Sequence, residues 1–153
     1  MSTDPRAAYR EAAAQTATPV QRVVLLYEQI IQDLQRVVHA MEAGNIELRC
    51  REIDHALRIV GQLQLSLDME HGGEVAANLE RFYNLLRANL IEAQIQGSRP
   101  LIEQQIAYLL SVREAWREVD RATVTEGEPG PAPSRPAAAK DLTTESLGAN
   151  WSA

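Results

Sequence analysis

Apolar residues recur at steps of three and four along several stretches of this chain, which is the spacing of one face of an α-helix. The clearest stretch follows the Gly72-Gly73 pair, and its apolar positions are Val75, Leu79, Phe82, Leu86, Leu90 and Ala93. Glycine tolerates the positive φ angles of a tight corner. The pattern therefore predicts a turn at this glycine pair and a helix from there to about residue 95, folded back on the helix before it.

A start signal precedes an earlier stretch of the same kind. Thr18 can cap a helix, Pro19 suits its first position, and Gln21 completes a capping box. At the other end of this stretch, Gly44 can stop the helix and Asn45 can cap the next one. The apolar stripe between these signals contains Val23, Tyr27, Ile30, Leu34, Val37 and Met41. The short link predicts antiparallel packing against the following helix.

Two more helices are predicted, one over residues 46 to about 67 and one over about 101 to 122. Their core stripes at about 100° per residue are Ile46, Cys50, Ile53, Leu57, Val60 and Leu67, then Ile102, Ile106, Leu109 and Trp116. Further apolar residues widen each stripe on one side: Leu48, Ile59 and Leu63, then Leu101, Tyr108, Val112 and Val119. These margins belong either to a generous core or to a groove that binds a partner helix.

The four helices predict an all-α protein, an antiparallel up-down four-helix bundle over residues 18–122. Residues 1–17 form an N-terminal capping segment, because the stretch 7–14 favours helix but is too short to be stable unless it docks, with Tyr9 as its anchor. Residues 123–153 are rich in Pro and Ala without apolar periodicity, and we expect a disordered C-terminal tail.

Charge and composition narrow the function. The chain has 153 residues, enough for one domain, and its 15 Lys and Arg against 21 Asp and Glu give a net charge of -6 without basic clusters. Nucleic acid is therefore not an expected partner. Apolar runs are too short to span a bilayer, so we expect a cytoplasmic protein without stable membrane insertion. The single cysteine, Cys50, excludes an internal disulfide and a cysteine metal cluster.

Candidate chemistry is sparse. The tetrad from Glu52 to His55 matches the Glu-x-x-His spacing of carboxylate metal sites in bundles. With Ile53 in the core, however, the two side chains point about 100° and 160° away from it, which predicts a solvated face. There is no phosphate-binding loop, dinucleotide fingerprint or nucleophile motif in the chain. We therefore expect no enzyme, no cofactor and no metal, and an interaction protein instead.

Four segments together resemble a known family: TPVQRVVLLYEQIIQDL, AGNIE, SLDMEHGGEVAANLERFY and VREAWREV. From about Tyr9 to Ala122 the chain is similar to the flagellin-specific secretion chaperones called FliS. The resemblance implies a client, the C-terminal region of flagellin, which the chaperone keeps from polymerising prematurely and helps to deliver to the flagellar type III export gate, itself a further partner. It also implies that the N-terminal segment covers apolar surface, with Tyr9 matching the family's tyrosine.

These inferences give a set of expected partner-binding residues: Tyr9, Leu48, Ile59, Leu101, Tyr108 and Val112. The alternative function is a helical interaction or regulatory module with a different client, and a metal-dependent enzyme ranks third. For the oligomeric state, we expect a monomer or a weak homodimer.

Overall fold

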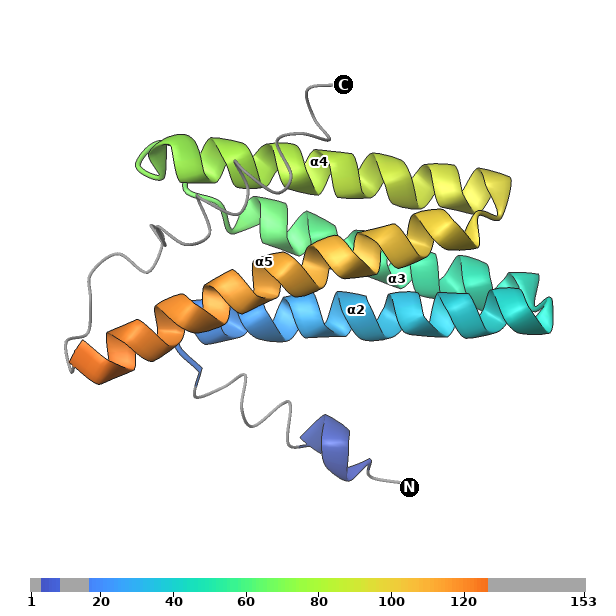
Figure 1. Ribbon diagram of the computed structural model, residues 1–153, viewed down its shortest axis with the longest axis horizontal. Coiled ribbons are helices and arrows are strands. Elements are labelled where there is room, and N and C mark those ends of the chain that lie inside the picture. Colours follow the sequence, from blue (N-terminus) through green and yellow to red (C-terminus); the bar gives the residue numbers. More distant parts are fainter. Residues whose placement is uncertain (1–3, 9–16, 127–153) are drawn as a thin grey trace.

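The computed structural model describes residues 4–8 and 17–126, apart from the side chains of 124–126 (Figure 1). The predicted anchor Tyr9 and residues 127–153 of the predicted tail lie outside the described residues, whereas residues 123–126, also predicted as tail, belong to the last helix. Four helices make up the main body: α2 (Pro19–Ala43), α3 (Ile46–Leu65), α4 (Gly73–Gln96) and α5 (Arg99–Glu126). The described residues contain no strand, so the predicted all-α class is confirmed.

Local chemistry sets the ends of the helices as predicted. Thr18 accepts a hydrogen bond from the backbone N–H of Gln21, and the Gln21 side chain accepts one from the backbone N–H of Thr18. Gly44 ends α2 with a φ of 67°, and the side chain of Asn45 accepts from the N–H of Leu48 to start α3. Each cap satisfies backbone groups that a helix end leaves without partners.

The helices form a closed ring in which each contacts two neighbours. The adjacent pairs are α2 with α3, α3 with α4, α4 with α5, and α5 with α2, whereas α2 does not contact α4 and α3 does not contact α5. Figure 1 shows α4 along the top of the bundle and α2 along the bottom. The pairs that include α2 are packed more closely than those that include α4. The predicted four-helix bundle is therefore confirmed, with α4 spaced farther from its neighbours than α2 is.

The core positions of α4 agree with prediction at all six positions from Val75 to Ala93, which are at most 7% exposed. Those of α3 do not. Ile46 is 64% exposed and Leu57 is only partly buried, whereas Ile59, predicted at the margin, is 5% exposed. The buried arc of α3 is rotated because this helix lies between α2 and α4, so its centre is set by both neighbours. Val112 of α5, also predicted at the margin, is completely buried.

Candidate partner-binding pocket

An apolar pocket of about 400 Å³ opens at one end of the bundle, where α2 and α4 begin and α3 ends. All four helices or their links contribute to it. Its lining consists of Pro19, Val20, Arg22, Val23, Leu26, Ser66, Leu67, Asp68, Gly72, Ala76, Leu79, Tyr83 and Trp116. A volume of this size suits a few side chains or a small organic molecule.

The turn between α3 and α4 forms one wall of the pocket and depends on two glycines. A Cβ on Gly72 would lie 2.4 Å from the carbonyl oxygen of Asp68, and Gly73 has a φ of 59°. The Asp68 carboxylate accepts hydrogen bonds from the backbone N–H groups of His71 and Glu70. The His71 backbone bond is the main reason that the pKa of Asp68 lies below its usual value. The predicted corner is thus confirmed, with a side chain that holds it.

Three large polar side chains meet beside the pocket. The hydroxyls of Tyr27 and Tyr83 are 2.8 Å apart and both residues are buried, with ring centroids 6.2 Å apart in an edge-to-face arrangement. Burial raises the pKa of both phenols well above the usual value. Trp116 is 5% exposed, and its indole N–H makes no hydrogen bond of ordinary geometry to the described residues, although it lies near enough to the Tyr27 hydroxyl to lower the pKa of that phenol slightly against the larger effect of burial. Since Tyr83 and Trp116 line the pocket, it is apolar but carries hydrogen-bond donors in its lining.

Exposed apolar side chains lie near the pocket and also at the opposite end of the bundle. Leu65 is 88% exposed and Met69 is 50% exposed, on either side of the pocket residue Leu67. At the other end of α3 and α4, Ile46 and Ile95 are 64% and 75% exposed. Exposed apolar residues of this size, next to a pocket, mark a surface suited to protein partners.

The residues predicted to bind a partner do not converge on this pocket. Leu101 and Tyr108 of α5 are half-buried, and the Tyr108 hydroxyl accepts a hydrogen bond from Gln104. Leu48 is half-buried on α3, which does not contact α5, so these side chains do not line one groove.

Two of the predicted partner-binding residues also need a correction. Ile59 and Val112 were predicted at the margins, as partner contacts or as part of a generous core, and the expected partner contact is wrong for both because their side chains belong to the buried core.

Sequence reasoning missed much of the pocket. The periodicity of α4 predicted only that Leu79 faces inward, and it did not include Tyr83. The one local signal was the Gly72-Gly73 corner, which brings the start of α4 to the end of α3.

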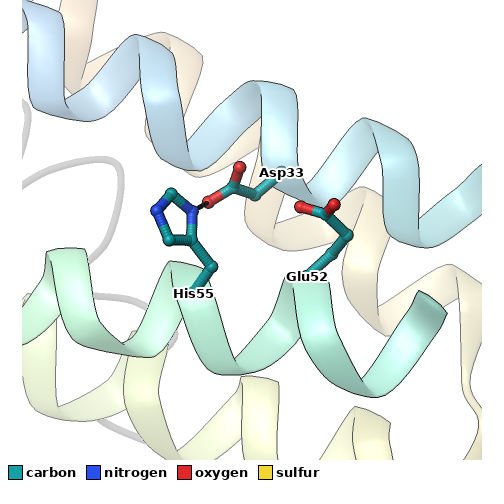
Figure 2. A group of neighbouring side chains, drawn as sticks. All are labelled: Asp33, Glu52 and His55. Atoms are coloured by element: carbon teal, nitrogen blue, oxygen red, sulfur yellow. Dashed lines mark hydrogen bonds and ion pairs between the residues drawn. The ribbon is translucent and has the colours of Figure 1, made fainter. Parts of the chain in front are cut away.

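Sequence reasoning also missed a buried carboxylate in the middle of α2. Asp33 is completely buried, and its Oδ2 lies 2.6 Å from Nδ1 of His55 on α3. Gln29 donates to Asp33 Oδ1 at 3.0 Å, and the guanidinium of Arg36 lies 3.5 Å from the same oxygen. Figure 2 shows Asp33 facing the two α3 side chains, Glu52 and His55. We call these five residues the Asp33 cluster, and they connect α2 to α3.

The Asp33 cluster changes our interpretation of the Glu52 to His55 tetrad. The His55 side chain is 49% exposed, in keeping with the predicted solvated face, but that of Glu52 is only 16% exposed. Ligand atoms of Asp33, Glu52 and His55 all lie within 4.8 Å of one another, so this set could hold a divalent cation. However, Arg36 already contacts both carboxylates, at 3.5 and 3.7 Å. We therefore interpret the group as an ion-pair network between two helices.

A four-helix bundle with an open apolar pocket and exposed apolar side chains beside it defines a class, the helical binding proteins. No helix in the described ranges combines the length and the apolar character needed to cross a membrane. The family model for the flagellar protein FliS matches residues 2–123, and the chain belongs to this family. Relatives in this family are named flagellar secretion chaperones, and chaperones are not an enzyme class.

Individual relatives support this assignment. The flagellar secretion chaperone FliSB of Pseudomonas aeruginosa is 35% identical over 106 residues, which cover 69% of this chain and 84% of the relative. The flagellar secretion chaperone FliS of Salmonella typhimurium is 28% identical over 110 residues, 71% of this chain and 82% of the relative. That of Bacillus subtilis is 23% identical over 115 residues, 75% and 85% of the two chains. The resemblance noted in the sequence is thus confirmed.

Proposed function

We propose that this protein is a cytoplasmic flagellar secretion chaperone that binds the C-terminal region of flagellin, prevents its premature polymerisation and helps to deliver it to the flagellar type III export gate. The observation that carries the proposal is the family match over residues 2–123, together with relatives named flagellar secretion chaperones. The apolar pocket and the exposed apolar residues beside it supply a surface for such a client.

The physical mechanism is competition for apolar surface. Flagellin segments that would otherwise pair with other subunits are covered while they lie on the bundle. Removing their apolar surface from water favours the complex by roughly 25 cal/mol per Å² before the costs of association are subtracted. The complex forms and dissociates without a covalent step, so binding shifts an equilibrium rather than changing the client. Reversibility is what an export chaperone needs, since the client must leave it at the gate.

Two parts of the surface serve different roles in this proposal. The pocket is lined by the first residues of α2, which come soon after the N-terminal segment in the sequence. In this proposal, Tyr9 of that segment covers the pocket until the client arrives. The half-buried residues Leu48, Leu101 and Tyr108 contact the client along the flanks of α3 and α5. Ile59 and Val112 support these flanks from the core rather than touching the client.

Co-purification tests the client directly. The tagged full-length protein is mixed with flagellin and, separately, with flagellin that lacks its C-terminal region. We expect recovery of the first and loss of the second. Equal recovery of both forms, or of neither, would refute flagellin as the client and favour a helical interaction or regulatory module with another partner.

A surface substitution tests the flank contacts. Tyr108→Asp places a charge on the half-buried flank of α5, and we expect flagellin affinity to fall about tenfold or more, as for a well-packed interface residue. The matched control is Ala107→Asp, which adds the same charge at the neighbouring exposed position of α5. Titration calorimetry measures both, with circular dichroism to verify that the helices remain. Equal losses in the two variants would contradict a specific role for Tyr108.

A further inference from the structure

The polar side chains beside the pocket contain more hydrogen-bond donors than acceptors can satisfy. Tyr27, Tyr83 and Trp116 supply two hydroxyl hydrogens and one indole N–H, and one bond joins the two hydroxyls. One hydroxyl donates to the other, so the hydrogen of the second hydroxyl is left over, whichever of the two tyrosines it belongs to. If the indole N–H does not reach the Tyr27 oxygen, it is left over as well. At least one buried donor therefore lacks an acceptor among the described residues.

Of the three donors, the Tyr83 hydroxyl and the Trp116 indole belong to residues that line the pocket, whereas Tyr27 does not line it. Leaving a buried donor without an acceptor costs about as much as a lost hydrogen bond, and such groups in native proteins call for an explanation. A ligand that brings an acceptor into the pocket removes this cost. The surplus donor is thus a recognition element and not only a defect of packing.

The rim of the pocket has the same electrostatic character. Gly72, the N-cap residue of α4, lines the pocket and offers no side chain to cap the start of that helix. Arg22 lies on the α2 side of the rim. The one carboxylate in the lining, Asp68, is already engaged with the N–H groups of its own turn. The pocket therefore offers the donor groups of Arg22, Tyr83 and Trp116 around apolar walls.

We propose that this pocket receives the C-terminal turn of an apolar helix, with a backbone carbonyl oxygen of that turn accepting from the Tyr83 hydroxyl and the Trp116 indole N–H. The last four carbonyls of a helix lack partners within the helix, and that end carries partial negative charge. Apolar side chains of the same turn fill the walls. The proposal rests on the proposed function only for the source of the helix, which is the client.

A carbonyl fits the donor surplus better than the other common acceptors do. It has two lone pairs and brings no hydrogen of its own, so it satisfies two donors without creating a third. A hydroxyl would bring another donor into the site. A carboxylate would carry a full charge into an apolar pocket, at a large desolvation cost.

A pair of small probes tests the recognition of a carbonyl without flagellin. Acetophenone and ethylbenzene have similar shapes, but only the first has a carbonyl oxygen. Each is added to the ¹⁵N-labelled full chain with the Trp151→Phe substitution, which leaves Trp116 as the one indole signal. We expect acetophenone to bind about fivefold or more tightly than the more apolar ethylbenzene and to move the indole N–H signal downfield. Ethylbenzene binding as tightly as acetophenone, or an unmoved indole signal, would overturn the proposal.

Two matched variants locate the donor. Tyr83→Phe and Tyr27→Phe each remove one hydroxyl from the same buried pair, but only Tyr83 lines the pocket. We expect the preference for acetophenone to fall about fivefold in the first variant and to stay within about twofold in the second. Equal effects of the two substitutions would count against a donor directed at the pocket.

The polarity of the helix is tested with two alanine-based peptides of equal composition, one with leucines in its last turn and one with them in its first. We expect only the former to displace acetophenone. Displacement by both to the same extent would overturn the choice of a helix C-terminus. Flagellin binding is measured on the same samples. If flagellin binds but the probes show no preference for the carbonyl, only this inference fails. If the probes show the preference but flagellin does not bind, flagellin is not the source of the helix.

Discussion

Two buried polar groups lie fewer than two helical turns apart on α2 and differ in how well they are satisfied. The Asp33 carboxylate has partners on its own helix and on α3, with His55 at 2.6 Å and Gln29 at 3.0 Å. The Tyr27 hydroxyl has one hydrogen bond, to Tyr83, in a set with a surplus donor. A complete network holds two helices together, whereas an incomplete one beside a pocket is available to a ligand.

The largest expected effect comes from placing a carboxylate in the same α2–α3 interface without the partners that Asp33 has. Ile59→Asp does this at a position that is 5% exposed, and we expect the free energy of unfolding to fall by about 4 kcal/mol or more. Urea denaturation followed by circular dichroism measures it. Leu57→Asp, at a half-buried position, should cost less. The opposite order would show that Ile59 lies at the margin, as the sequence suggested.

The second prediction removes the satisfied carboxylate. Asp33→Ala takes away the charge-assisted hydrogen bonds between α2 and α3, and we expect a loss of about 2 to 3 kcal/mol in the free energy of unfolding. Asp54→Ala is the control, since it breaks the exposed Arg58–Asp54 pair, which should contribute about 0.5 kcal/mol or less. The denaturation midpoints of the two variants give the comparison. A loss no larger than that of the control would mean that the Asp33 cluster does not connect the helices energetically.

The third prediction concerns alkaline pH and the tyrosine pair. Burial raises the pKa of Tyr27 and Tyr83 in the folded protein, so the folded state keeps the two phenolic protons at a pH at which the unfolded chain releases them. The stability of the fold is therefore unaffected below the pKa of an unfolded tyrosine and falls as the pH rises above it. Above about pH 10 the free energy of unfolding should fall by up to about 1.4 kcal/mol per pH unit for each buried tyrosine. Tyr27→Phe should make this slope shallower. Phe82→Leu, a core substitution without a hydroxyl, should leave the slope unchanged.

The smallest effect is expected from Tyr83→Phe at neutral pH. The substitution removes one hydrogen bond but also one donor from a set that has too many, so the two contributions oppose each other. We expect a change of about 1 kcal/mol or less in the free energy of unfolding, well below that of Asp33→Ala. Thermal and urea denaturation both report it. A loss as large as that of Asp33→Ala would show that the tyrosine pair is as fully satisfied as the Asp33 cluster.

Features decided by neighbouring residues in the sequence were predictable. The cap at Thr18, the stop at Gly44 and the corner at Gly73 each follow from the chemistry of a few adjacent residues, and the structure confirms them. The core stripe of α4 was also correct, because this helix has one regular apolar face.

Features decided by residues far apart in the sequence were not predictable. Periodicity gives the angle between two residues of α3, but it does not tell which side of the helix the neighbouring helices cover. Ile59 was therefore misplaced. Asp33 escaped notice because its partner, His55, is 22 residues away and belongs to another helix. The pocket combines α2, α4, α5 and the link between α3 and α4, so single-helix patterns could not define it.

The ring arrangement also has a consequence for how the chain folds as it is synthesised. One flank of α2 packs against the next helix, but the other packs against the last, and the bond between Gln21 and Asp120 spans 99 residues. Because synthesis proceeds from the N-terminus, α2 and α3 can pair early, whereas Val24 on the α5 side waits for the whole bundle to emerge. Most neighbouring helices are adjacent in sequence, which favours fast closure once α5 is available. A protein whose relatives are named chaperones thus passes, during its own synthesis, through a stage in which one apolar side of α2 is not yet covered.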